Sequence, residues 1–119
     1  MTIEALISKV QEEKPNSFQT PKLLEFINEI EAEVAEQLRA FAPVYDEGDM
    51  ERKLLAAAPY DKLYVSYLKS MIDYANEEIE SYQNNAVQHV QDFRDFTDWV
   101  VRSGVAKQTM AHTRFNGIF

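Results

Sequence analysis

The segment from Tyr60 to Asn76 carries apolar side chains over an unusually wide arc. On a helical wheel these side chains fill two neighbouring sectors that together cover roughly 200°, whereas a surface helix shows a stripe of about 100°. A helix of this kind has to contact other elements on two sides, so we predict a central helix here. The first sector holds Tyr60, Tyr64, Tyr67, Met71 and Tyr74, and the second holds Val65, Leu68, Ile72, Ala75 and Ile79.

Three further helices are predicted around it, which gives an all-α, four-helix bundle-like domain over residues 1–103. Residues 2–13 begin at Thr2, a suitable N-cap, and a second helix has Thr20 as its predicted N-cap and Pro21 at its first helical position. A third predicted segment runs from about Ser81 to Arg102, with Gly104 after its end. The predicted core positions are Ile3, Leu6, Ile7 and Val10; Leu23, Ile27, Ile30, Val34, Leu38 and Phe41; and Ala86, Val90, Phe93, Thr97, Val100 and Val101.

The charge of the chain is strongly acidic and unevenly distributed. The net charge of −8 over 119 residues argues against a general nucleic-acid binder, which would need Lys and Arg to neutralise phosphates. Residues 104–119 carry +2 from Lys107 and Arg114, so residues 1–103 carry −8 − 2 = −10. We therefore expect an acidic helical body followed by an extended or flexible basic tail over residues 104–119.

Patterns that would indicate catalysis, metal binding or export are missing. The chain has no cysteine, which excludes disulfides and suits synthesis in the cytoplasm, and no apolar run reaches membrane-spanning length. His89 and His112 belong to no metal-binding pair, and His89 fits a partly buried, hydrogen-bonded residue better than a surface metal ligand shared with Asp92. The acidic turn at residues 46–51 lacks calcium-loop spacing. We predict no enzyme activity, no cofactor and no metal.

Three surface features are candidates for interaction. An acidic row on the second helix is either a solvated face, which we favour, or a face that meets a basic partner or lines a channel; it consists of Glu25, Glu29, Glu33 and Glu36. Trp99 is either an interface residue or a cover for one end of the bundle. The tail is either a disordered end or a docking segment for a neighbouring copy or another virion protein, with Lys107, Arg114, Phe115, Ile118 and Phe119 as its anchors.

One block of sequence resembles a known family. The run Leu54-Leu55-Ala56-Ala57-Ala58-Pro59-Tyr60-Asp61-Lys62-Leu63-Tyr64, followed by Ile72-Asp73-Tyr74-Ala75-Asn76 and Tyr82-Gln83-Asn84-Asn85, is similar to the head–tail connector proteins of siphophage-type tailed phages, also called adaptor or head-completion proteins. The positions that carry the resemblance are Pro59, Tyr60, Asp61, Leu63, Tyr64, Asp73, Tyr74 and Asn76. Relatives often have glycine after the position of Asn76, where this chain has Glu77, so the sequence leaves open whether a helix breaks there.

The resemblance implies a structural role in a phage or prophage particle. Proteins of this type look like small helical bundles that form a homo-oligomeric ring on the portal and extend the DNA channel. The implied partners are the portal protein, a further neck or tail-completion protein and other copies of the chain, with DNA only as passing cargo and no membrane. The implied location is the virion neck, after synthesis in the bacterial host cytoplasm. An adaptor and a later stopper-like component both remain open, and the alternative is a soluble regulatory interaction module unrelated to virions.

Overall fold

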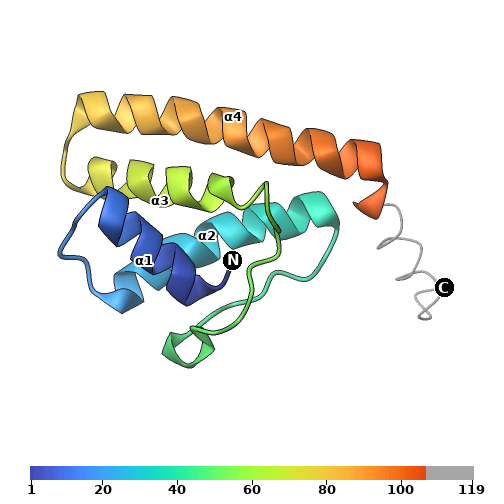
Figure 1. Cartoon of the computed structure of the whole chain (residues 1–119), viewed down its shortest axis with the longest axis horizontal. Coiled ribbons are helices and arrows are strands. Elements are labelled where there is room, and N and C mark those ends of the chain that lie inside the picture. The colour runs from blue at the N-terminus through green and yellow to red at the C-terminus, as the bar shows by residue number, and fades with distance from the viewer. Residues whose placement is uncertain (107–119) are drawn as a thin grey trace.

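A computed structural model of the chain describes residues 1–106, and these form four α-helices and one short 3-10 helix (Figure 1). The elements are α1 (Ile3–Glu13), α2 (Thr20–Leu38), η1 (Glu47–Asp49), α3 (Lys62–Ala75) and α4 (Ile79–Ser103). The predicted all-α class is therefore confirmed. The tail residues predicted as anchors, Lys107, Arg114, Phe115, Ile118 and Phe119, lie outside the described residues.

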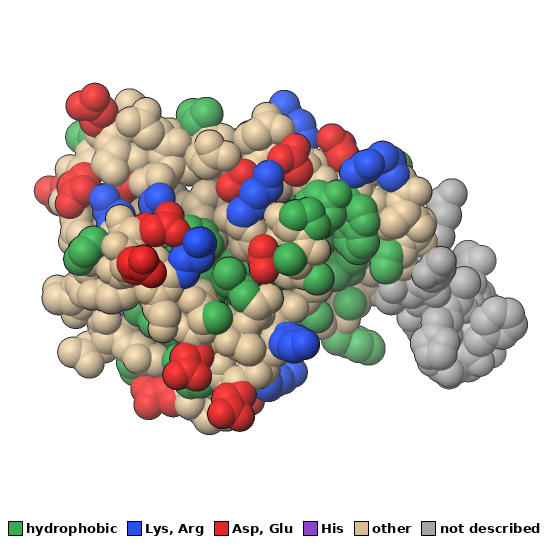
Figure 2. Space-filling model, in the orientation of Figure 1, with side chains coloured by type: hydrophobic (Ala, Val, Ile, Leu, Met, Phe, Trp, Pro, Cys, Tyr) green, Lys and Arg blue, Asp and Glu red, His purple; other side chains and the backbone are tan. Residues whose placement is uncertain are grey.

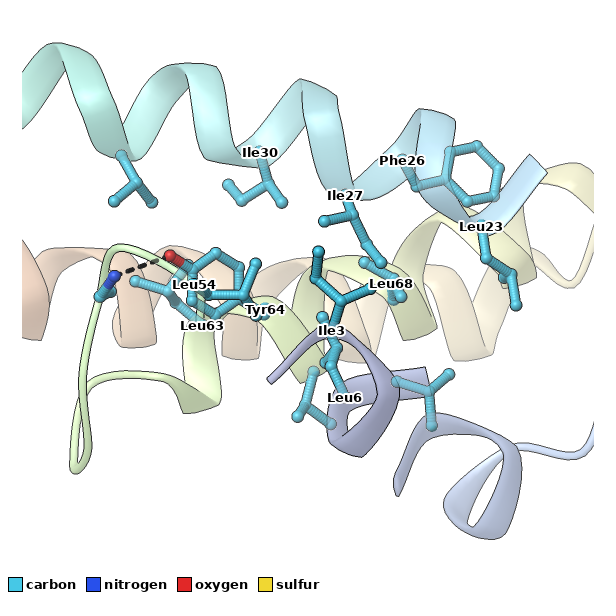
Figure 3. Packing of buried hydrophobic residues seen from close by; sticks show 14 of the residues in the cluster. Ile3, Leu6, Leu23, Phe26, Ile27, Ile30, Leu54, Leu63, Tyr64 and Leu68 are labelled. Atoms are coloured by element: carbon cyan, nitrogen blue, oxygen red, sulfur yellow. Dashed lines mark hydrogen bonds between the residues drawn. The ribbon is translucent and has the colours of Figure 1, made fainter. Parts of the chain in front are cut away.

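The central position predicted for the helix that follows Tyr60 is confirmed. α3 contacts α1, α2 and α4, and Figure 1 shows α4 lying along one side of α3 with α1 and α2 on the other. Both predicted sectors bury side chains, because Tyr64 of the first sector and Leu68 and Ile72 of the second have no exposed surface. The C-terminal ends of the sectors are wrong: Tyr74 is 66% exposed, and Ile79 is 70% exposed and belongs to α4. Figure 3 shows how residues from α1, α2 and α3 meet in the core.

The start of α1 is held in place by its N-cap and by the segment that joins α2 to α3. The hydroxyl of Thr2 accepts a hydrogen bond from the N–H of Ala5 at 3.1 Å, which satisfies one of the free donors of the first turn. The N–H of Ile3 donates to the carbonyl of Arg52 at 3.1 Å. The first residues of the chain therefore pair with residues about fifty positions later.

α2 both begins and ends earlier than the sequence predicts. The predicted N-cap Thr20 is already helical, and the N-cap is Gln19, whose side chain makes no capping hydrogen bond. The last helical residue is Leu38, and Arg39 adopts the left-handed conformation with φ of 55°. The N–H of Ala40 then bonds the carbonyl of Ala35 at 2.9 Å, which closes the helix. As a result the core position predicted for Phe41 is wrong: this side chain lies beyond the helix and is 98% exposed.

The helix does break after α3. Asn76 is the C-cap of α3, and Glu77 then adopts a left-handed conformation with φ of 58° before α4 begins at Ile79. That conformation favours glycine because a Cβ crowds the backbone. Glu77 thus adopts a backbone conformation that is typical of glycine, so the break between α3 and α4 forms without a glycine.

The buried face predicted for α4 is wrong in part. Val90 is 56% exposed and Val101 is 81% exposed, while Asp92 and Phe96 face inward together with the correctly predicted Val100. The helix presents polar residues to α3 along much of its length, and these find partners there. The pattern of apolar residues alone therefore placed the helix in the wrong rotation.

Candidate functional site

The block that resembles the connector family builds the junction between the long α2–α3 segment and the core. Leu63 and Tyr64 are fully buried, and Tyr60 stacks on Trp99 with ring centroids 5.4 Å apart. The carboxylate of Asp61 pairs with the amino group of Met1 at 3.4 Å, and Pro59 is exposed three residues before α3. These residues hold the fold together, so the block is a structural element.

A buried carboxylate on α2 organises this junction. Glu31 has no exposed surface, and its Oε2 accepts hydrogen bonds from the hydroxyl of Tyr45 at 2.6 Å and the N–H of Leu55 at 3.0 Å. Its Oε1 accepts from the hydroxyl of Tyr64 at 2.6 Å. The Tyr64 oxygen in turn accepts from the N–H of Ala56 at 2.9 Å, the bond drawn in Figure 3. The Glu31 side chain therefore links α2 to α3 and to two residues of the segment between these helices, Tyr45 and Leu55.

The two tyrosine hydroxyls in this network remain donors. Burial raises the pKa of Tyr45 and of Tyr64 above the ordinary value, and the neighbouring Glu31 carboxylate raises both further. Both hydroxyls donate to the buried carboxylate of Glu31, so the network presents no reacting group to a substrate. We missed Glu31 in the sequence because α2 is rich in glutamate. The signal was its place on the apolar face, three residues before Val34 and four after Ile27.

A second buried carboxylate joins α1, α3 and α4. Asp73 has no exposed surface; its Oδ2 accepts from Ser81 Oγ and from Asn85 Nδ2, each at 2.7 Å, and Lys14 Nζ pairs with its Oδ1. Burial alone raises the pKa of Asp73, but the hydrogen bonds from Lys14, Ser81 and Asn85 outweigh burial and lower it below the ordinary value. Asp73 and Asn85 both belong to the family-like stretches, and they meet here.

His89 is a half-buried residue held by α3, as the sequence indicates. Its Nδ1 lies 3.0 Å from the carbonyl of Leu63 and 3.4 Å from Ser66 Oγ, and its ring contacts those of Tyr67 and Phe93. Since a carbonyl only accepts, the proton of the neutral ring sits on Nδ1. Burial lowers the pKa of His89, although Leu63 and nearby carboxylates act in the opposite direction.

The predicted acidic row is exposed along α2. All four glutamates face solvent; Glu29 accepts from the hydroxyl of Tyr67 at 3.1 Å, and Glu25 pairs with Lys22 at 3.3 Å. Tyr74, another position of the resemblance, is also exposed, whereas Trp99 is half-buried between Tyr60 and Phe96. Trp99 therefore covers one end of the bundle, and its role in an interface stays a prediction.

Apolar side chains also remain on the surface. Figure 2 shows them gathered where the segment before α3 passes the C-terminal half of α4. Exposed large apolar residues occur on α4 and in the segment after α2 as well: Ile79, Val87, Val90 and Val101, and Phe41 and Val44. These side chains make surfaces that another protein can cover.

Within residues 1–106, no three His, Asp or Glu side chains are placed to hold a metal ion together. None of the helices described there has both the length and the apolar character needed to span a bilayer. No family model, no curated protein and no solved structure matches the chain.

Proposed function

We propose that this chain is a non-enzymatic head–tail connector of a tailed phage or prophage that forms a ring against the portal protein in the virion neck. The observation that carries the proposal is the exposed apolar side of α4, a helix of 25 residues whose opposite side packs on α3. An isolated subunit has no use for such a surface, whereas a subunit of an assembly buries it.

The family-like residues support a role based on shape. Leu63, Tyr64 and Asp73 are buried in the junctions that set the positions of the helices. A connector subunit needs these junctions to be rigid because it has to present fixed surfaces to its neighbours and to the portal.

The charge of the chain suits a channel that DNA passes through. Protein binding to DNA gains affinity when cations neutralise phosphates, so an acidic lumen leaves passing DNA free to move. The exposed row of Glu25, Glu29, Glu33 and Glu36 is the candidate for that lining.

Co-sedimentation with portal rings tests the proposal. Purified protein is mixed with portal rings of the same phage, and negative-stain microscopy is expected to show an added layer on the ring. A variant that lacks residues 107–119 keeps every residue of the described core, so it should still unfold cooperatively on heating. We expect this variant to bind the portal more weakly. Absence of any layer at micromolar concentration and moderate salt would contradict the proposal.

The acidic row also favours a second candidate, a regulatory module that binds a basic partner helix. Charge complementarity would then steer the association. A stable 1:1 complex with a host protein, weakened by the substitution Glu33→Lys and by added salt, would support this candidate in place of the connector role.

A further inference from the structure

Two exposed apolar surfaces lie on different elements of the molecule. The first, which we name the α4 stripe, consists of Ile79, Val87, Val90 and Val101. The second, which we name the knob, consists of Phe41 and Val44. Figure 1 shows α4 along one edge of the molecule, while the segment after α2 turns away from α4 toward η1. A contact that covers only one of these surfaces would leave the other exposed.

The α4 stripe is straight and long. Ile79, Val90 and Val101 follow each other at intervals of eleven residues, which is about three turns, so they line up along one side of the helix over about 33 Å. Ile79 and Val87 are 70% and 71% exposed. The stripe faces away from Phe96, which points into the core. A side chain of another molecule can therefore pack against the α4 stripe at several positions along the helix.

Unpaired charges accompany both surfaces in a complementary pattern. Arg94 and Asp98 lie on α4 between Val90 and Val101. On a helical wheel Arg94 falls within the sector of the α4 stripe, and Asp98 lies at the edge of that sector. Within residues 1–106, the side chains of Arg94 and Asp98 are exposed and make no hydrogen bond or salt bridge, although the charge of Arg94 helps to lower the pKa of the neighbouring Asp95.

The knob is flanked by the opposite charges. Glu36 lies in the last turn of α2 and Arg39 follows that helix, both exposed and just before Phe41. Their side chains also make no ion pair or hydrogen bond within the described part of the chain. Glu36, the last residue of the acidic row, is thus available to Arg94 of another molecule, and Arg39 to Asp98; Glu25, Glu29 and Glu33 then remain for the channel lining. Val44, 79% exposed, adds apolar area beside Phe41.

We propose that copies of this chain dock head to tail, with the knob of one copy on the α4 stripe of the next. This inference rests on the proposed ring and specifies its lateral contact. Each copy uses its knob once and its stripe once, so the contact is heterologous and repeats until the ring closes. Pairing of Glu36 with Arg94, and of Arg39 with Asp98, would fix the direction of the contact.

Disulfide trapping tests the contact directly, because the chain has no cysteine of its own. Phe41→Cys and Val90→Cys are made in separate chains of different mass, and both positions are exposed, so both variants should fold. We expect the mixed 41–90 dimer to exceed either homodimer by about tenfold after oxidation. Ser8→Cys, at an exposed position of α1, is the matched control and should cross-link to position 90 only at the background level.

Complementation tests the direction of docking. Phe41→Asp removes the knob and Val90→Asp removes the stripe, so neither variant should self-associate, and a 1:1 mixture should form a dimer that does not grow. Arg94→Glu should weaken association about tenfold or more because it places two glutamates opposite each other, and Glu36→Arg on the partner copy should restore it.

A dominant 90–90 homodimer would show a symmetric α4–α4 contact and overturn the inference, as would cross-linking at the background level for all pairs. These measurements contain no portal protein. Head-to-tail trapping without a portal layer would therefore overturn the proposed function alone, and a portal layer with background cross-linking would overturn the inference alone.

Discussion

Replacing Glu31 with glutamine tests whether the buried carboxylate stabilises the fold. The carboxylate accepts three hydrogen bonds, from two tyrosine hydroxyls and the N–H of Leu55. A glutamine has one acceptor oxygen, which can keep the bonds from Tyr45 and Leu55. Its amide then faces the hydroxyl of Tyr64, whose oxygen already accepts from Ala56. The hydrogen of Tyr64 is left without an acceptor in a buried site.

The expected loss follows from that one missing bond. A hydrogen bond to a charged group contributes about 1.5–3 kcal/mol, so Glu31→Gln should lower the free energy of unfolding by about 2–3 kcal/mol. Tyr64→Phe leaves both Oε1 of Glu31 and the N–H of Ala56 unpaired and should lower it by about 2–4 kcal/mol. Because the two residues share one bond, the double variant should fall short of the sum by about 1–2 kcal/mol.

The chain supplies a matched control on the same two helices. Glu29 and Tyr67 also form a glutamate–tyrosine pair between α2 and α3, but at 3.1 Å and with Glu29 in solvent. Glu29→Gln should lower the free energy of unfolding by no more than about 0.5 kcal/mol. Urea unfolding followed by far-ultraviolet circular dichroism measures all variants. If Glu31→Gln shifts the unfolding free energy no further than Glu29→Gln does, or if the cycle with Tyr64→Phe is additive, the reasoning fails.

Three further residues give testable predictions, the first with a control at its neighbour. Glu77→Gly relieves a left-handed residue and should raise the unfolding free energy by about 1 kcal/mol in urea, whereas Asn76→Gly, at a negative φ, should not. Asp73→Asn should lower it by about 3 kcal/mol at pH 7. Because the pKa of Asp73 is lowered, its contribution is present above about pH 4 and lost as the pH falls through the folded-state pKa, so unfolding curves of the variant should lack this acid loss. The pKa of His89 is also lowered, so protonation of its ring below about pH 6.5 favours the unfolded chain. His89→Gln should therefore reduce the change of the unfolding free energy with pH between roughly pH 5 and 7. An unchanged pH dependence would contradict this assignment.

Local signals in the sequence predicted the elements well. The cap at Thr2, the proline near the start of α2 and the glycine after α4 each act within one turn, so they can be recognised without the rest of the fold. The width of the apolar arc predicted the central place of α3 because burial on two sides requires apolar residues on two sides.

Polar contacts between helices explain the errors. α4 turns Asn85, His89 and Asp92 toward α3, and these replace the apolar residues that periodicity expects at an interface. The partner Asp73 cannot be inferred from α4 alone. The partners of Glu31 likewise come from two other segments of the chain, so its place on the apolar face of α2 does not identify them.

The candidate surfaces were predicted only in part. The exposure of Glu25, Glu29, Glu33 and Glu36 follows from their shared face on α2. The α4 stripe and the knob did not emerge, because Val90 and Phe41 satisfy a core pattern as well as a surface one. A periodic apolar pattern identifies a face to be covered, but the covering molecule can be the same chain or another.

The contacts of α1 determine when this chain can finish folding during synthesis. The N–H of Ile3 donates to the carbonyl of Arg52, and the amino group of Lys14 contacts Asp73, Ser81 and Glu78. Glu78 lies 64 residues after Lys14. Contacts that join distant residues close late because the intervening chain has to be ordered first. On the ribosome α1 therefore emerges well before the residues of α3 that cover it. We expect the apolar side of α1 to stay open to chaperones until α3 has left the exit tunnel.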